Sequence, residues 1–133
     1  MDLVDVITSD DKPLAYFVSH DAKAQETSFL TPDHLPLQLG FVVYPKGGEI
    51  PRHRHRPLER RIEGTNEFLL VRSGRCEIDI YDENNTVVAT RELGQGDVVL
   101  LVGGGHGLRM LEDCVLLEVK QGPYMGIDEK ERF

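Results

Sequence analysis

The chain has few of the features that mark secreted, membrane-spanning or disulfide-rich proteins. Its two cysteines, Cys76 and Cys114, are too few for a disulfide framework, and both lie in segments of alternating apolar residues, which is typical of buried thiols. The longest apolar run, residues 98–102, is far too short to cross a bilayer. Residues 1–5 are acidic and lack the basic and then apolar pattern of a signal peptide. These absences favour a cytoplasmic protein.

Positive charge is also scarce. The sequence has 15 Lys and Arg against 23 Asp and Glu, which gives a formal net charge of −8. Nucleic acids and anionic membranes attract basic surfaces, so we expect neither as the main partner. A chain of 133 residues is long enough for one domain with its own hydrophobic core.

Short apolar or alternating segments, separated by turn residues, fill most of the sequence. Residues 14–18 follow a turn-forming cluster and are expected to form a hairpin with residues 4–8. Residues 75–81 alternate between apolar and charged side chains, which is the pattern of a half-buried strand. No window of about 11 or more residues has helical periodicity. The pattern is typical of an all-β sandwich or barrel. The other expected strands are residues 37–44, 67–71, 87–89, 98–102, 108–110 and 114–119.

His53 and His55 are the strongest chemical signal in the sequence. On a strand, residues two apart face the same side, with their β-carbons about 6.5–7 Å apart. Their imidazole nitrogens can then converge on one divalent metal, with bonds of about 2.0–2.2 Å. On a helix the two side chains would point apart. The pair therefore predicts half of a metal site, provided that this stretch is extended.

The residues around this pair resemble the first motif of the cupin superfamily. In that motif a glycine, a His-x-His pair, a glutamate and a second glycine follow one another in a fixed order. Here five residues separate the first glycine from the histidines, and six separate the glutamate from the second glycine. The matching residues are Gly47, His53, His55, Glu67 and Gly74.

Residues 96–101, a glycine-rich turn and His106 are similar to the second cupin motif, although Val102 and Met110 stand where the family usually has Pro and Asn. The resemblance covers roughly residues 37–119. It implies an all-β, double-stranded β-helix or jelly-roll barrel in which His53, His55, Glu67 and His106 bind a metal. We accordingly expect a single domain over residues 1–133. Its parts would be an N-terminal arm over 1–36, the barrel over 37–120 and a C-terminal extension over 121–133.

Two glutamates compete for the carboxylate ligand, because eleven residues separate His55 from Glu67 where the family usually has three or four. Glu59 stands at the short spacing. We favour Glu67, since it begins a strand that leads to Gly74 at the motif spacing and would be held rigidly. Glu59 lies in a segment that reads as a loop, where an ion pair with a neighbouring arginine is the simpler interpretation.

Three imidazoles and one carboxylate suit one divalent transition metal, whether Zn, Fe, Mn, Ni, Co or Cu, and affinity alone would not select among them. Four protein ligands leave room for water or substrate on a five- or six-coordinate metal. His20 and His34 match neither motif.

Other residues could bind or transform a ligand. Arg60 and Arg61, in the insert after His55, could hold a carboxylate or phosphate, or could simply be neutralised by neighbouring glutamates. Glu118 is expected opposite the face of Val115, Leu117 and Val119, so it could act inside the barrel as a general base or could pair with an arginine. A pocket over the metal that contained Glu118 or Tyr44 would favour an enzyme.

Two functions agree with this sequence. The first is a metal-dependent isomerase, lyase or dioxygenase acting on a small polar, anionic or sugar-like substrate, since fold and ligands do not fix the reaction. The alternative is a non-catalytic metal-containing module that binds or senses a ligand. We also expect a homodimer, because residues 14–30 carry more apolar surface than a short arm needs and an exposed edge strand is a liability. The alternative is that this segment folds back on its own barrel.

Overall fold

The computed structural model describes residues 3–126 and 129–133, which form ten strands and no helix. The chain divides by its contacts into two units. The sandwich unit comprises Met1–Ala22 and Thr65–Phe133, and the middle segment comprises Lys23–Gly64. The all-β prediction is confirmed. The expected parts of the domain, with boundaries after residues 36 and 120, stay a prediction.

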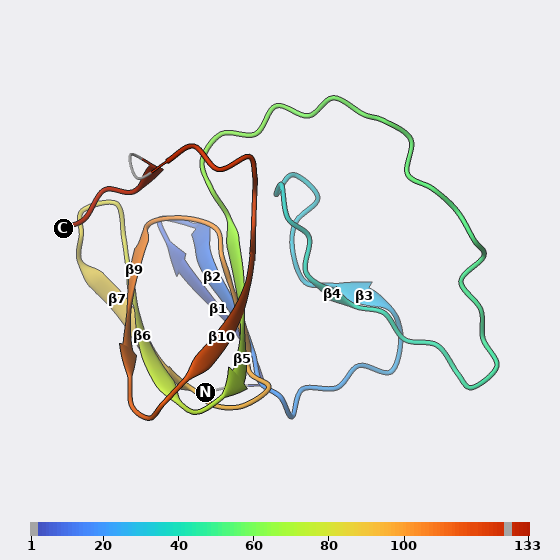
Figure 1. The fold of residues 1–133 in the computed structure, drawn as a ribbon, viewed down its shortest axis with the longest axis horizontal. Coiled ribbons are helices and arrows are strands. Elements are labelled where there is room, and N and C mark those ends of the chain that lie inside the picture. The colour runs from blue at the N-terminus through green and yellow to red at the C-terminus, as the bar shows by residue number, and fades with distance from the viewer. Residues whose placement is uncertain (1–2, 127–128) are drawn as a thin grey trace. The chain divides into compact units, whose positions relative to one another are not determined.

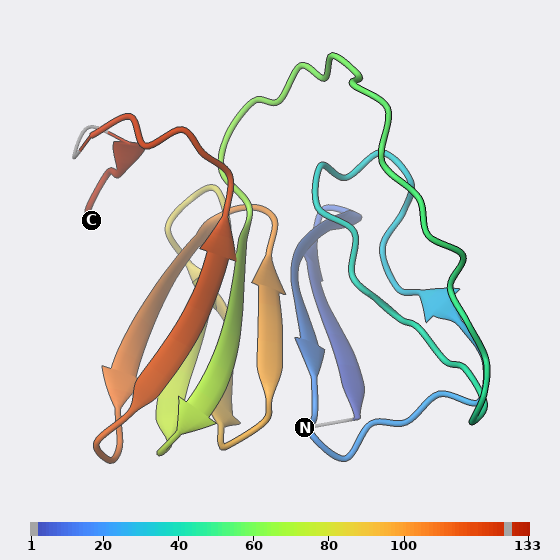
Figure 2. The same cartoon turned by 45° about the vertical axis from the view of Figure 1, so that its right-hand side comes forward.

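The larger sheet of the sandwich unit has five antiparallel strands in the order β1-β2-β8-β5-β10. β1 and β2 form the expected hairpin, and Asp10 and Asp11 at its turn have positive φ angles of 50° and 61°, as a tight two-residue turn requires. β10 lies at one edge beside β5 (Figure 1), and β8 lies on the other side of β5 (Figure 2). The strands are β1 (Val4–Ser9), β2 (Lys12–Val18), β5 (Glu67–Ser73), β8 (Val98–Leu101) and β10 (Val115–Lys120).

The smaller sheet has three antiparallel strands in the order β7-β6-β9. These are β6 (Cys76–Tyr81), β7 (Val87–Leu93) and β9 (Gly105–Met110). The turn between β6 and β7 holds Asn85 at a φ of 62°, which agrees with the hairpin tip expected there.

The hydrophobic core lies between these two sheets, because each contributes every second side chain to it. On β5 the buried residues are Leu69 and Val71, and on β6 they are Ile78 and Ile80. Burial of each such side chain contributes about 1.5–3 kcal/mol. The cluster consists of Ile7, Leu14, Ala15, Phe17, Leu69, Val71, Cys76, Ile78, Ile80, Ala89, Leu93, Val99 and Leu101.

The sandwich unit has two distinct ends. At the end that we call the mouth, β5 begins, β10 ends and β9 begins, since Glu67 pairs with Lys120 and Gly105 pairs with Tyr81 (Figure 2). At the opposite end, which we call the turn end, the β5–β6 turn meets the β9–β10 turn. There the Leu111 amide donates to the Arg75 carbonyl over 2.9 Å.

The middle segment contains β3 (Ser28–Phe29) and β4 (Gly40–Phe41), which pair only with each other. The strand expected over residues 37–44 is therefore reduced to two residues. No strand is described over residues 42–66, so the extended strand expected to carry His53 and His55 is also missing from the structure. Most side chains here are exposed, with Val42 at 58% and Tyr44 at 52%. A strand becomes stable only beside a neighbour, and these residues have none within the segment.

None of the three sheets closes on itself within the described residues, so the jelly-roll barrel stays a prediction. That part of the chain also contains no helix long and apolar enough to cross a membrane.

Candidate functional site

Glu67 and His106 meet at the mouth of the sandwich unit. Glu67 begins β5 on the same face as the buried Leu69, and His106 lies on β9 on the same face as Leu108, which packs against the core. The His106 Nε2 atom is 3.8 Å from the Glu67 Oε2 atom, and the two side chains are 30% and 18% exposed. Two residues predicted from separate motifs are therefore brought together, one from each sheet.

The Glu67–His106 separation is compatible with a shared metal. A distance of 3.8 Å is too long for a hydrogen bond. Two donor atoms that each bind one metal at about 2.1 Å can be no more than about 4.2 Å apart, so the observed distance is compatible with both ligating the same ion. Both side chains are partly exposed, which leaves the ion and any ligand a route of entry.

Glu118 and Lys120 lie on the neighbouring strand at the same end. In the register of β10 with β5, Glu118 pairs with Leu69 and Lys120 pairs with Glu67. Leu116 packs against the core, so alternation directs Glu118 and Lys120 to the inner face. The Lys120 Nζ atom is 3.8 Å from the Glu118 Oε1 atom, so the glutamate has a lysine beside it and not the arginine that the sequence suggested.

The outer face of β10 confirms the expected alternation. Val115, Leu117 and Val119 are all exposed there, opposite the face of Leu116 and Glu118.

Phe133 also lies at the mouth, and the sequence interpretation missed it. Its ring packs edge-on against Tyr81, with the ring centroids 5.0 Å apart. A β-carbon on Gly105 would come within 2.8 Å of the Phe133 ring, so the start of β9 accommodates this contact only without a side chain. The only indication of this contact in the sequence is that Phe133 is an aromatic residue directly after a polar stretch.

His53 and His55 form a second pair, within the middle segment. Their ring centroids are 5.2 Å apart with an interplanar angle of 73°, and both rings are exposed. The His53 Nδ1 atom is 2.8 Å from the carbonyl oxygen of Pro51. When Nδ1–H donates to that oxygen, Nε2 is left with its lone pair free to bind a metal.

The candidate ligand-binding residues of the middle segment are also exposed. Arg61 forms an ion pair with Glu63 at 2.9 Å, and these side chains are 89% and 78% exposed. This contact matches the alternative in which glutamates neutralise the arginines of the insert. Arg60, Glu59 and Tyr44 are exposed as well.

The ligand set predicted from the sequence is thus present as two pairs in different units, Glu67 with His106 and His53 with His55. In residues 3–126 and 129–133, no three His, Cys, Asp or Glu side chains converge in a way that would hold a metal ion. Glu67 lies on β5 beside His106, whereas Glu59 is exposed and lies outside any strand.

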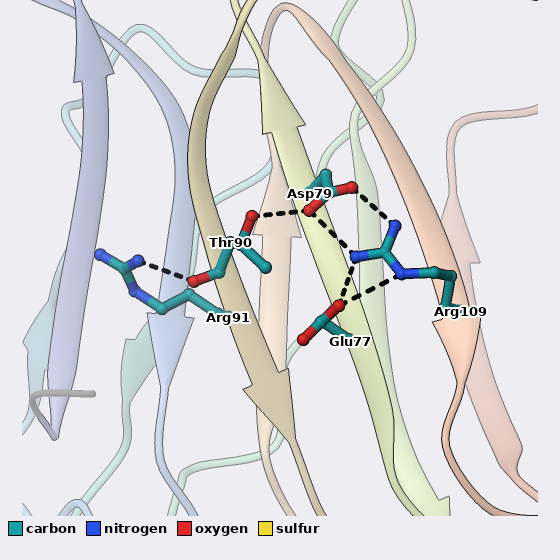
Figure 3. A network of polar contacts seen from close by, with 5 residues as sticks. All are labelled: Glu77, Asp79, Thr90, Arg91 and Arg109. Atoms are coloured by element: carbon teal, nitrogen blue, oxygen red, sulfur yellow. Dashed lines mark hydrogen bonds and ion pairs between the residues drawn. The ribbon is translucent and has the colours of Figure 1, made fainter.

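A second polar cluster lies on the outer face of the smaller sheet (Figure 3). The Arg109 guanidinium on β9 bonds to Glu77 and to Asp79, reaching Asp79 Oδ2 over 2.7 Å, and the Thr90 hydroxyl donates to Asp79 Oδ1 over 2.6 Å. Arg109 and then Thr90 lower the pKa of Asp79 to about 2. These side chains satisfy one another across β7, β6 and β9, so the cluster serves to join the strands.

No family model matches the chain, and no curated protein and no solved structure matches it either. Interpretation of the site therefore depends on its residues and geometry. The mouth offers a carboxylate and an imidazole at metal-binding separation, with a second carboxylate and an ammonium group on the next strand.

Proposed function

We propose that this chain is a metal-binding small-molecule protein of the cupin type, whose metal is held by His53, His55, Glu67 and His106. The observation that supports this best is the Glu67–His106 pair. The two residues come from motifs far apart in the sequence and from different sheets, yet their side chains meet at one end of the sandwich unit. Three of the five histidines, His53, His55 and His106, also fall on motif positions.

The proposed fold is a closed jelly-roll barrel. β10 and β9 each lie at the end of their sheet and so have one edge without a partner in the described residues. Such edges are normally paired or covered. Within residues 37–44 only β4 has a strand neighbour in the middle segment, and the stretch around His53 and His55 has none. Their pairing with the two edges would complete the barrel and bring the second pair of ligands to the mouth.

The metal would be one of Zn, Fe, Mn, Ni, Co or Cu, and when bound it would polarise an oxygen atom of a small polar ligand. Glu118 would accept a proton from that ligand, while the Lys120 ammonium group would hold an anionic part of it. We propose Arg60, Arg61 and Tyr44 as further ligand-binding residues. The corresponding reaction class is isomerisation, lyase chemistry or dioxygenation.

A non-catalytic ligand-binding or sensing module is the alternative, and one contact favours it. Glu118 lies 3.8 Å from Lys120, so its carboxylate could be engaged in an ion pair and not in proton transfer. In either case we propose a cytoplasmic homodimer. Residues 14–18 are buried in the core and so do not supply the apolar surface that the sequence suggested for a dimer. The exposed apolar side chains of β10 support a partner surface on that strand instead.

Metal content tests the proposal. The purified protein should hold about one transition metal per chain by elemental analysis. The His53→Ala/His55→Ala double variant should lose it, and Glu67→Gln should bind added Co²⁺ at least about tenfold more weakly. The matched controls are His34→Ala, which removes a histidine outside the motifs, and Glu59→Gln, which removes the competing carboxylate. Both controls should retain the metal.

Full retention of metal by the double variant would refute the site. A greater loss of affinity in Glu59→Gln than in Glu67→Gln would instead leave the site intact and reverse the assignment of its carboxylate. The Co²⁺ absorption spectrum separates these cases, because it changes when a ligand to the ion is replaced.

A further inference from the structure

The two cysteines of the chain lie together at the turn end of the sandwich unit, away from the mouth. Cys76 is the first residue of β6 and is fully buried, at 0% exposure. Cys114 directly precedes β10, is partly exposed and packs against the core. Cys76 belongs to the hydrophobic core and Cys114 packs against that core, and both thiols are free.

The backbone around the two cysteines fixes this proximity. The amides of Leu111 and Glu112 donate to the Arg75 carbonyl over 2.9 and 3.3 Å, which ties the β9–β10 turn to the residue before Cys76. A β-carbon on Gly74 would come within 2.9 Å of the Cys114 Cα atom, so the two turns approach as closely as their backbones allow. Cys114 ends one of these joined turns and Cys76 directly follows the other, so the backbone contact brings the two residues to the same end of the core.

We propose that Cys76 and Cys114 are an oxidative modification site, which a low-molecular-weight disulfide converts reversibly into an intramolecular disulfide. The thiolate of Cys114 attacks one sulfur of the reagent, forming a mixed disulfide and releasing one thiolate. The thiolate of Cys76 then attacks Cys114 Sγ, the new sulfur–sulfur bond forms, and the second reagent thiolate leaves. The two cysteines lose two electrons, the reagent gains them, and the two thiol protons end on the released thiols.

Burial determines the order of these steps. Cys114 is partly exposed and can meet the reagent, whereas Cys76 is out of its reach. Burial, with a smaller contribution from Cys114, raises the pKa of the Cys76 thiol to about 11. Only a small fraction of Cys76 is therefore thiolate near neutral pH. The second step should therefore be slow near neutral pH. While the pH stays below that pKa, each increase of one pH unit should accelerate the step by about tenfold.

The disulfide would join the two sheets covalently, because Cys76 belongs to the smaller sheet and Cys114 leads into the larger one. It closes a long loop that includes β7, β8 and β9, and such a crosslink restricts the unfolded chain. The oxidised protein should therefore melt at a higher temperature than the reduced protein. A dithiol reductant should restore the original melting temperature.

Intact-mass measurement after treatment of the native protein with excess oxidised glutathione tests this site. The wild-type chain should end lighter by two hydrogen atoms, with no glutathione retained and no chains joined. Cys76→Ala should retain one glutathione, because its mixed disulfide cannot be resolved, and Cys114→Ala should retain none in native buffer. Alanine is small and apolar, so both variants keep the character of the core.

The conversion of the mixed disulfide should speed up as the pH is raised. A wild-type chain that stops with one glutathione attached, takes up two, or links to a second chain would overturn the proposal. The wild-type result decides the question even if one variant does not fold.

Discussion

The sandwich unit encloses a core of apolar side chains between two sheets, whereas most side chains of the middle segment face solvent. β6 has a neighbour on both sides, and its Cys76, Ile78 and Ile80 are fully buried. In the middle segment β4 pairs with β3 over only two residues, and the apolar residues that follow it are exposed. The two regions contain similar alternating sequences, so the difference arises from partners: a strand gains its stability from its neighbours and from burial of one face.

The largest difference in stability between the two regions should appear when two glycines with nearly the same backbone conformation are replaced by alanine. Gly74 in the sandwich unit has a φ of 83° and Gly64 in the middle segment has a φ of 79°. A β-carbon on Gly74 would come within 2.0 Å of the Asp113 carbonyl oxygen, whereas nothing lies within 4 Å of one on Gly64. Gly74→Ala should therefore lower the free energy of unfolding by about 3–5 kcal/mol, and Gly64→Ala by about 1 kcal/mol at most.

Urea unfolding of both variants measures this difference. The strain of placing alanine at a positive φ is nearly the same in both, so the difference between their losses of stability reports the packing around each glycine. Equal losses of unfolding free energy in the two variants would mean that the β5–β6 turn relaxes freely. The sandwich unit would then be no more tightly packed at Gly74 than the middle segment is at Gly64.

The sequence predicted the sandwich unit well because its signals are local and mutually consistent. The β1–β2 hairpin and β6 follow from alternation between turn residues. The meeting of Glu67 with His106 was predicted only through the motif resemblance, because no local signal relates residues so far apart. The strand expected over residues 37–44 is mostly absent, since alternation does not specify a partner. Phe133 was missed because a contact at the mouth depends on the path of the whole tail.

A smaller effect should separate two ion pairs, one from each region. The Asp79 side chain is 12% exposed and bonds to Arg109 and Thr90, whereas Arg61 and Glu63 are both largely exposed. Asp79→Asn should lower the free energy of unfolding by about 1–2 kcal/mol, because Arg109 keeps Glu77 as a partner but loses its stronger bonds. Glu63→Gln should change it by less than about 0.5 kcal/mol.

The pH dependence checks the same contrast. The pKa of Asp79 is lowered to about 2 in the folded protein, below the value of an unfolded Asp, so its contribution is present above the unfolded value and disappears as pH falls toward 2. The destabilisation by Asp79→Asn should therefore shrink when thermal unfolding is repeated in acid. A loss that is the same at neutral and acidic pH would assign the effect to packing and not to charge.

The smallest expected effect concerns two histidines outside the motifs, His20 in the sandwich unit and His34 in the middle segment. The His20 Nδ1 atom is 2.9 Å from Asp97 Oδ1, and the His20 amide donates to the same oxygen over 2.7 Å. The bond to Asp97, and then the charge of Asp21, raise the pKa of His20 above its usual value. The charged imidazole therefore stabilises the fold fully below its unfolded pKa, and this contribution is lost as pH rises through the folded pKa.

Thermal unfolding of the wild type should consequently show a melting temperature that falls between mildly acidic and mildly alkaline pH. His20→Gln should flatten that slope, because the side chain no longer titrates, while His34→Gln should leave the slope as it is in the wild type. Asp97 is held from a second side by the Gly94 amide over 2.8 Å, so the turn before β8 should persist in the His20 variant. An unchanged slope in His20→Gln would show that the exposed ring contributes too little charge energy to matter, and that the backbone bonds to Asp97 alone secure this corner of the sandwich.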